Sequence, residues 1–334
     1  MLNRLLSGRW LVVMMAFGGF SLLSGCSHTP QTQRLLQDVG PSLSQRVELS
    51  DVPFFPQTEF QCGPAALATV FQYRAKAVLP DDLVSQVYVP EKQGSLQIEM
   101  TAAVRRQGLV PYPLAGSLEA LLREVAAGNP VLVMQNLAFS WYPQWHYAVV
   151  VGYDLAVQTL VLRSGETRRW QTTLRTFENT WARSNYWGLV IVPPSLLPVT
   201  ATRSGWLKQA FDLEQVGQLS AAEVAYQTAH YAWQDDTDSG LALGNLYYRQ
   251  GRYAESAQIF AELVTRAPRN AALWNNWAYA LQAMPCPLSA FSAAKCAQRL
   301  SPADDNIFST RRDMQQTLSD PSAQSCRWRV ICPQ

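Results

Sequence analysis

Apolar and polar positions divide the chain into a first part with short helices and strands and a second part that is helical throughout. In the first part, apolar residues at helical spacing predict helices at 64–75, near 79–83, and at 99–107, 117–128 and 174–183. Runs rich in β-branched and aromatic residues predict strands at 130–136, 146–153, 158–163 and 187–192. Helices followed by an antiparallel sheet indicate an α+β domain over 47–193.

After a linker at 194–205, the pattern repeats with a period of 34 residues. The copies run roughly over 203–236, 237–270 and 271–304, and we place the repeat domain at 206–304. The middle copy resembles a tetratricopeptide repeat, because it reads Leu243-Gly244-x2-Tyr247-x3-Gly251-x-Tyr253-x6-Phe260-x7-Pro268. The resemblance implies helix–turn–helix units that bind peptides or proteins. An unrelated helical bundle is the alternative.

Residues 1–25 are expected to be a secretory signal rather than part of the fold. Arg4 and Arg9 flank the start of an apolar stretch, Trp10–Leu23, which is too short for a stable membrane span. It ends in Leu23-Ser24-Gly25-Cys26, which resembles the lipobox of bacterial lipoproteins and implies lipidation of Cys26. An ordinary signal peptide or a membrane anchor is the alternative.

Residues 26–46 are polar and non-periodic, and they predict a tether between the lipid and the first domain. Ser27 follows the lipid-bearing cysteine, and by the usual sorting rule this sends a lipoprotein to an outer membrane, facing the periplasm. Removal of 1–25 leaves 25 basic and 25 acidic residues. A neutral chain gives no electrostatic reason to expect nucleic acid. We therefore expect a lipid-anchored protein of the cell envelope.

Four cysteines lie in about the last fifty residues, in the final repeat and in a tail at 305–334: Cys286, Cys296, Cys326 and Cys332. Their use fits an oxidising compartment. Mostly helical residues separate Cys286 from Cys296 by roughly 12–15 Å at about 1.5 Å per residue, beyond the ~7 Å Cα limit for a disulfide. We therefore expect the tail to fold back and each of its cysteines to bond one of the other two. Which bonds which stays open.

Cys62 has the surroundings of a nucleophile. It precedes Pro64 at the start of a predicted helix, where unpaired N–H groups and the helix dipole lower the pKa of a thiol. Of the three histidines, only His146 opens a buried strand, since His28 follows the signal and His230 lies in the repeats. This is a papain-like arrangement, in which imidazole deprotonates the thiol. A buried structural cysteine and a core histidine are the alternatives.

Two motifs resemble those of the C39-type cysteine peptidases: Gln57-x4-Cys62-Gly63-Pro64-Ala65-Ala66 and His146-Tyr147-Ala-Val-Val-Val-Gly152. The resemblance covers roughly 47–193 and implies a papain-like fold. It makes Cys62 the nucleophile, His146 the base and Gln57 an oxyanion-hole donor beside the Cys62 N–H. Gln61 is a rival for that last role.

The third catalytic residue departs from the family, where an Asp-Pro on the strand after the histidine strand orients the imidazole. Here Arg163 or Ser164 stands at that point. Asp154 and Ser164 are the candidate orienters, and Glu166 is a further substitute for the carboxylate. A missing orienter weakens a triad without abolishing it, because the other groups carry much of the rate.

The sequence therefore predicts an envelope lipoprotein with a thiol peptidase domain that hydrolyses a peptide bond, and repeats that recruit a substrate or partner. The alternative is a catalytically degenerate peptide-binding adaptor. No cofactor or metal is expected, because no other Cys or His lies at ligand spacing from Cys62 or His146. Loop 137–145 places aromatic residues directly before His146, and we interpret it as a wall of the substrate cleft rather than as core packing.

Overall fold

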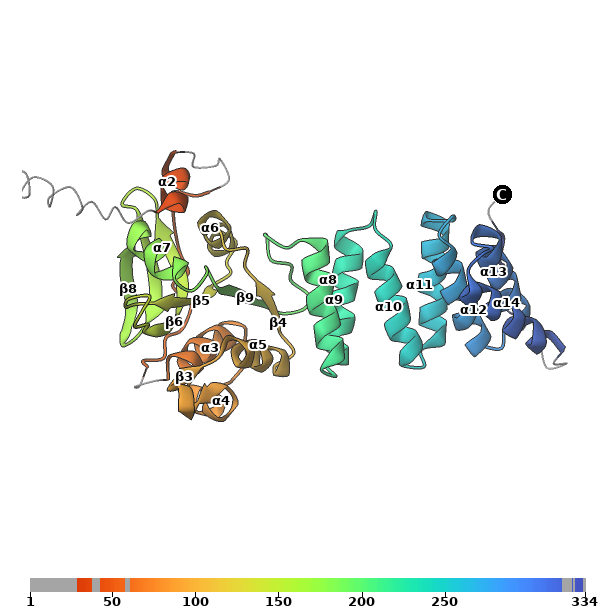
Figure 1. The fold of residues 1–334 in the computed structure, drawn as a ribbon, viewed down its shortest axis with the longest axis horizontal. Coiled ribbons are helices and arrows are strands. Elements are labelled where there is room, and N and C mark those ends of the chain that lie inside the picture. Colours follow the sequence, from red (N-terminus) through yellow and green to blue (C-terminus); the bar gives the residue numbers. More distant parts are fainter. Residues whose placement is uncertain (1–28, 38–42, 58–60, 320–325, 327, 333–334) are drawn as a thin grey trace, which may run out of the picture.

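The structure is a computed structural model that describes residues 29–37, 43–57, 61–319, 326 and 328–332. A sheet domain is followed by a row of helices that extends away from it, so that the molecule is elongated (Figure 1). The signal, Cys26 and its lipobox lie outside the described residues. Among the described residues, no helix has both the length and the apolar character needed to cross a membrane.

The sheet is antiparallel and places β6 at its centre. The strand order is β4-β9-β5-β6-β7-β8, and β1 pairs with β6 beyond a bulge near Val150 and Gly152. The strands are β1 (Arg46–Glu48), β4 (Val110–Pro113), β5 (Val131–Asn136), β6 (Trp145–Asp154), β7 (Thr159–Ser164), β8 (Thr167–Thr173) and β9 (Gly188–Val192). A separate small pair is formed by β2 (Tyr88–Val89) and β3 (Gly94–Ser95), joined by the 3-10 helix η2 (Pro90–Lys92).

Helices cover both faces of the sheet, because alternate residues of the central strands are apolar on both sides. Tyr147, Val149 and Val151 of β6 pack with α3 (Cys62–Tyr73), α4 (Pro80–Val87) and α5 (Gln97–Arg106). Ala148 and Val150 face the opposite core, which includes α6 (Leu118–Ala126) and α7 (Leu174–Ala182). The two faces of β6 therefore belong to two different cores.

The strongly periodic segments of the first domain match the sequence predictions to within a few residues. The expected tether is wrong over part of its length, because Pro30–Gln37 forms α2, which packs on α6 and α7. The Glu178 carboxylate of α7 accepts hydrogen bonds from the backbone N–H groups of Gln31 and Thr32, and Leu35 is buried. An acceptor at a helix N-terminus satisfies donors that the helix itself leaves unpaired, so this short polar helix is stabilised by tertiary contacts.

Seven α helices follow β9 in the described part of the chain: α8 (Arg203–Gln215), α9 (Leu219–Ala232), α10 (Asp238–Arg249), α11 (Tyr253–Arg266), α12 (Ala271–Ala283), α13 (Pro287–Leu300) and α14 (Asp305–Gln316), before a 3-10 turn, η3 (Thr317–Ser319). The second helix of each pair begins at residue 219, 253 or 287, at 34-residue intervals. At Gly244 a Cβ atom would lie 2.8 Å from the Phe260 ring, so the absent side chain lets α10 and α11 approach closely.

The helical row is joined to the sheet domain by packed contacts. The Arg105 guanidinium of α5 lies 2.6 Å from the Asp212 carboxylate of α8, and the rings of Tyr112 and Trp206 pack together. Within the predicted linker, the backbone N–H and hydroxyl of Thr200 both donate to the buried Glu124 carboxylate. The linker is therefore held to the sheet domain at this residue.

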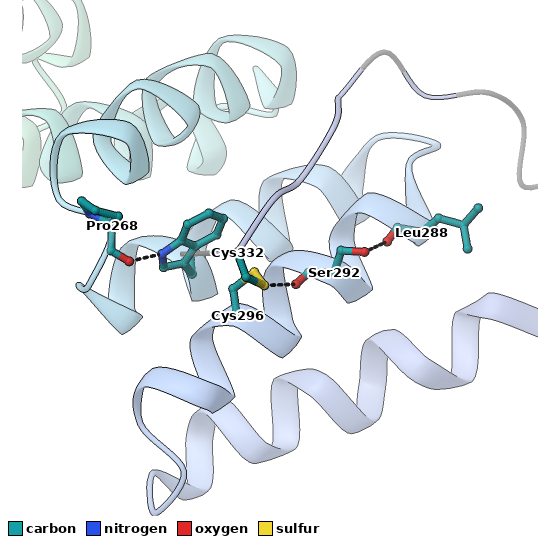
Figure 2. Close-up of a disulfide and its surroundings, with 6 residues drawn as sticks. Pro268, Leu288, Ser292, Cys296 and Cys332 are labelled. Carbon is teal, nitrogen blue, oxygen red and sulfur yellow. Dashed lines mark hydrogen bonds between the residues drawn. A yellow bond between two sulfur atoms is a disulfide. The ribbon is translucent and has the colours of Figure 1, made fainter. Parts of the chain in front are cut away.

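Two disulfides join the carboxy-terminal tail to the last helices. Cys286 is bonded to Cys326 and Cys296 to Cys332, with Cα–Cα distances of 5.1 and 5.3 Å. Figure 2 shows the second bond, where the Cys332 sulfur also lies 3.9 Å from the Ser292 carbonyl oxygen. Cys286 and Cys296 do not bond each other. The tail folds back onto α13.

Candidate active site

Cys62 is the first residue of α3 and is partly exposed. Pro64 lies in the first turn, where its missing N–H costs no helical hydrogen bond. Backbone N–H groups of Tyr147, Gly63 and Cys62 itself hydrogen-bond toward the thiol and lower its pKa, whereas burial raises it. Burial is the larger effect, so the pKa of Cys62 lies above its ordinary value. The thiol therefore contacts the backbone of Tyr147, the residue that follows His146 on β6.

His146 is the second residue of β6, and its partner lies on β7. Its Nε2 atom is 2.9 Å from Ser164 Oγ. If Nε2 carries the ring proton and donates it to Ser164, then Nδ1 is left as the basic nitrogen. Burial lowers the pKa of His146 to about 4, so the resting imidazole is neutral. Among the described residues, no hydrogen bond joins His146 to Cys62.

The two glutamines considered for the oxyanion hole lie differently. Gln57 Nε2 is 3.4 Å from the Tyr147 carbonyl oxygen, and the Gln57 backbone N–H donates to the Gly165 carbonyl at 3.1 Å. The amide of Gln57 thus lies next to the strand position that the Cys62 thiol contacts. Gln61 instead lines a cavity of about 260 Å³ with Phe55, Pro56, Ala65, Leu79, Pro80 and Asp81.

The candidate orienters occupy opposite ends of the sheet. Ser164 is in contact with His146, whereas Asp154 ends the same strand that His146 opens, eight residues further along it. At about 3.3 Å per residue in a strand, roughly 26 Å separates them. Asp154 accepts hydrogen bonds from the backbone of Ala156 and Val157 and lies 3.8 Å from Arg46. Of these two candidates, Ser164 is the one that contacts the imidazole.

The Arg163 side chain lies on the face of β7 opposite Ser164, and its contacts are with backbone carbonyl groups. Its guanidinium is buried and donates to the carbonyl oxygens of Val52, Ser50 and Arg168. These bonds hold the chain that leads to Gln57. Our sequence interpretation noticed Arg163 only as a replacement for a carboxylate. Its role as a donor to backbone carbonyls was missed, because nothing in a strand pattern shows which loop crosses its edge.

The loop between β5 and β6 is exposed. Trp141 is 81 % exposed, and the side chains of Phe139 and Tyr142 are more than half exposed. Core packing is therefore wrong for this loop, which directly precedes His146 in the chain.

The family comparison matches residues of the sheet domain. A family model described as Peptidase_C39 like family matches residues 49–188. Two solved structures are similar at 19 % sequence identity. One is a putative C39-like peptidase from Bacillus anthracis, with a TM-score of 0.38, covering 45 % of this chain and 98 % of that one. The other is a double glycine motif protease from an AMS/PCAT transporter in complex with the leader peptide, with a TM-score of 0.32, covering 43 % and 93 %. No curated protein matches by sequence.

The segment matched by the family model contains Cys62, His146 and Ser164. Over residues 49–188 the sheet domain is thus similar to the C39-like peptidase family. The helices after β9 lie outside the match. The backbone N–H of Tyr147 is the functional group that sequence reasoning missed, because a main-chain donor leaves no residue-type signal.

Proposed function

We propose that this protein is a thiol peptidase in which Cys62 is the nucleophile, His146 the base and Ser164 the residue that orients the imidazole. The observation that carries the proposal is the hydrogen bond between His146 Nε2 and Ser164 Oγ, together with a Cys62 thiol that contacts the backbone of the adjacent residue, Tyr147. It leaves Nδ1 as the atom that exchanges protons.

The reaction is acyl transfer to sulfur. The Cys62 thiol proton moves to His146 Nδ1 while the sulfur bonds to the substrate carbonyl carbon. The Cys62 N–H and the side-chain amide of Gln57 donate hydrogen bonds to the oxyanion. To do so, the Gln57 amide gives up its hydrogen bond to the Tyr147 carbonyl. Protonation of the leaving amine by His146 breaks the C–N bond. Water then hydrolyses the thioester, and its proton returns through His146 to the thiol.

The proposal includes a location in the cell envelope. Cys26 carries the lipid of a lipoprotein that faces the periplasm, and the two disulfides of the tail fit an oxidising compartment. The helices α8–α14 act as tetratricopeptide repeats that recruit a peptide or protein. Their 34-residue interval and the close approach at Gly244 support this assignment.

A non-catalytic peptide-binding adaptor is the second candidate. It is favoured by the burial that keeps both the thiol and the imidazole neutral and by the lack of a hydrogen bond between them in the described structure. An apo structure does not by itself exclude a catalytic pair, because such contacts often tighten only when substrate binds.

Labelling of Cys62 by a peptidyl vinyl sulfone separates the two functions. A catalytic pair predicts that His146→Ala slows labelling at pH 7 by about 100-fold, in the range that general-base catalysis supplies. Iodoacetamide titration of the same variants reports the thiol itself. If both proteins label alike and only as the pH rises above about 8.5, the ordinary pKa of a free thiol, the pair does not function and the adaptor replaces the peptidase.

A further inference from the structure

We propose that loop 137–145 binds the part of a peptide substrate that follows the scissile bond, and that it selects a large apolar side chain there. The inference rests on the proposed peptidase function and names the side of the site that carries specificity. It assigns a role to the exposed aromatic loop that the catalytic groups leave unexplained.

The loop presents an apolar surface without any charged side chain. Its sequence is Leu-Ala-Phe-Ser-Trp-Tyr-Pro-Gln-Trp, and its five large apolar side chains are all at least 47 % exposed: Leu137, Phe139, Trp141, Tyr142 and Trp145. An aromatic side chain buries about 150–250 Å² when it is covered, so several together offer a large binding surface. A contiguous exposed patch of this kind marks a site of interaction more often than chance exposure does.

The aromatic side chains are held in place by hydrogen bonds within the loop. Asn136 Oδ1 accepts from the backbone N–H groups of Ala138 and Gln144, and Asn136 Nδ2 donates to the Phe139 carbonyl. The rings of Phe139 and Trp141 stack with centroids 5.6 Å apart and planes 11° from parallel. A preorganised surface loses less conformational entropy when it binds a ligand, and this favours recognition.

A cation from α7 secures the base of the loop. Arg183 donates to the Ala138 carbonyl at 2.6 Å and to the Asn136 carbonyl at 3.4 Å. Its guanidinium is therefore engaged with the loop's own backbone. Membrane-inserting aromatic loops usually carry basic residues for lipid headgroups, and loop 137–145 has none. A peptide is the favoured occupant.

The chemistry fixes which half of the peptide meets the loop. The leaving amine takes its proton from His146, so the first residue after the scissile bond must begin beside this imidazole. An extended chain advances by about 3.3–3.6 Å per residue, so its first side chains remain near His146. Trp145 and the loop directly precede His146 in the chain and are therefore within reach of these side chains.

Trp145 connects the loop to the face of the sheet that packs against α3. It lies two positions before Tyr147, so both side chains leave β6 on the same side. Tyr147 belongs to the core that packs α3, and its ring contacts Trp187 edge to face at 5.6 Å. Trp145, which is half exposed, continues that face outward from the Cys62 end of the strand.

The test measures binding without turnover. The full chain with Cys62→Ala, in non-ionic detergent, is titrated with peptides X-Ala-Ala-amide that have a free α-amine and carry Phe, Trp, Leu, Gly or Asp at X. These probes imitate the cleavage product that carries the newly formed amine. We expect the apolar probes to bind at least tenfold more tightly than those with Gly or Asp, measured by calorimetry.

Two variants then locate the contact. Trp141→Ala and Phe139→Ala are each expected to weaken the Phe probe by roughly tenfold, which corresponds to about 1.4 kcal/mol. Tyr231→Ala is the matched control, because Tyr231 is a comparably exposed aromatic on α9 at 73 % and should leave binding unchanged. Acetylation of the probe amine should also weaken binding, since the amine is expected to lie at His146.

Several results overturn the inference. Equal affinity for the apolar, Gly and Asp probes excludes selection at this subsite, and unchanged affinity in both loop variants excludes the loop. A further measurement is the quenching of tryptophan fluorescence in vesicles of brominated phosphatidylcholine. Quenching in the Cys62→Ala protein that disappears when Trp141→Phe is added would place the loop in the bilayer instead. Because Cys62 is absent from the binding test, these outcomes are independent of whether the vinyl sulfone experiment supports peptidase activity.

Discussion

Ser164 Oγ and His146 Nε2 lie 2.9 Å apart on adjacent strands, β7 and β6. A hydroxyl at this point can fix the ring orientation and the tautomer of the imidazole, but it brings no negative charge to stabilise an imidazolium ion. Burial lowers the pKa of His146 to about 4 and raises that of the Cys62 thiol. The resting thiol and the resting imidazole are accordingly both neutral, and burial is the physical reason.

Replacing the hydroxyl by a carboxylate should change the charge state of the site. In Ser164→Asp, a negative charge next to His146 is expected to raise the imidazole pKa by about 1–3 units, the usual effect of an opposite charge in contact. Cys62 alkylation at pH 6–7 should then become faster by about tenfold, because the thiolate–imidazolium pair is stabilised. The pH profile of iodoacetamide labelling measures this change.

Two control variants accompany the experiment. Ser164→Ala removes the orienting contact and should slow iodoacetamide labelling of Cys62. The pH midpoint of labelling should shift by less than one unit. Asp154→Asn changes a carboxylate at the far end of β6, which caps a turn and contacts Arg46, and should leave the profile as it is. An effect of Asp154→Asn as large as that of Ser164→Asp would contradict the assignment of Ser164.

Protein stability should depend on pH through His146. Its pKa is about 4 in the folded protein and near 6.5 in an unfolded chain, so the unfolded state binds more protons between these values. This contribution to the free energy of unfolding is complete above about pH 6.5 and is lost as the pH falls toward 4. Urea unfolding of the wild type and of His146→Gln between pH 4 and 7 should show a smaller slope in the variant. Identical slopes would mean that His146 is not buried as neutral imidazole.

The sequence was sufficient for elements whose pattern is local. The apolar run from His146 to Tyr153 predicts a buried strand, and the Ser117 cap and Gly128 stop delimit α6 closely. The places of Cys62 at a helix start and of His146 at a strand opening were also within reach, since both are local signals. The 34-residue interval of the helices could be read from spaced residues alone.

Other features depend on partners that are distant in the sequence. β8 runs Thr-Arg-Arg-Trp-Gln-Thr-Thr and is mostly exposed, so it has little apolar signal and exists because it pairs with β7. α2 is short and polar, and its donors are satisfied by Glu178, about 147 positions away. The sequence left the residue that orients the imidazole undecided for the same reason. The strand register that brings Ser164 to His146 depends on the bulges around β7, and the residue pattern does not show these bulges.

The buried carboxylate of Glu124 should couple the helical row to the sheet domain. It accepts from the backbone N–H and hydroxyl of Thr200 and from the Asn129 amide. Glu124→Gln removes the charge and turns an amide donor toward groups that also donate, which should cost about 1–3 kcal/mol. Hydrogen exchange of residues 195–202 should increase. Glu119→Gln, an exposed position on the same helix, is the matched control and should change neither stability nor exchange.

The two disulfides should stabilise the end of the helical row and leave the sheet domain unaffected. They close segments with sequence separations of 40 and 36, and each bond is expected to contribute about 2–4 kcal/mol. The tail also packs through Trp328, whose ring meets Trp277 edge to face and whose carbonyl accepts from the Ser289 hydroxyl. Removing Cys286–Cys326 by a paired replacement with alanine should speed hydrogen exchange in α12 and α13.

The local character of that effect follows from the packing. Residues of α12–α14 and the tail form a hydrophobic cluster of their own, whereas α3 and β6 belong to another. Cys62→Ala is the matched control, since it removes a free cysteine and should leave exchange in the helices unchanged. If the paired replacement instead accelerated exchange equally in β5, β6 and α3, the two parts would unfold as one unit, and the tail would contribute to the stability of the sheet domain as well.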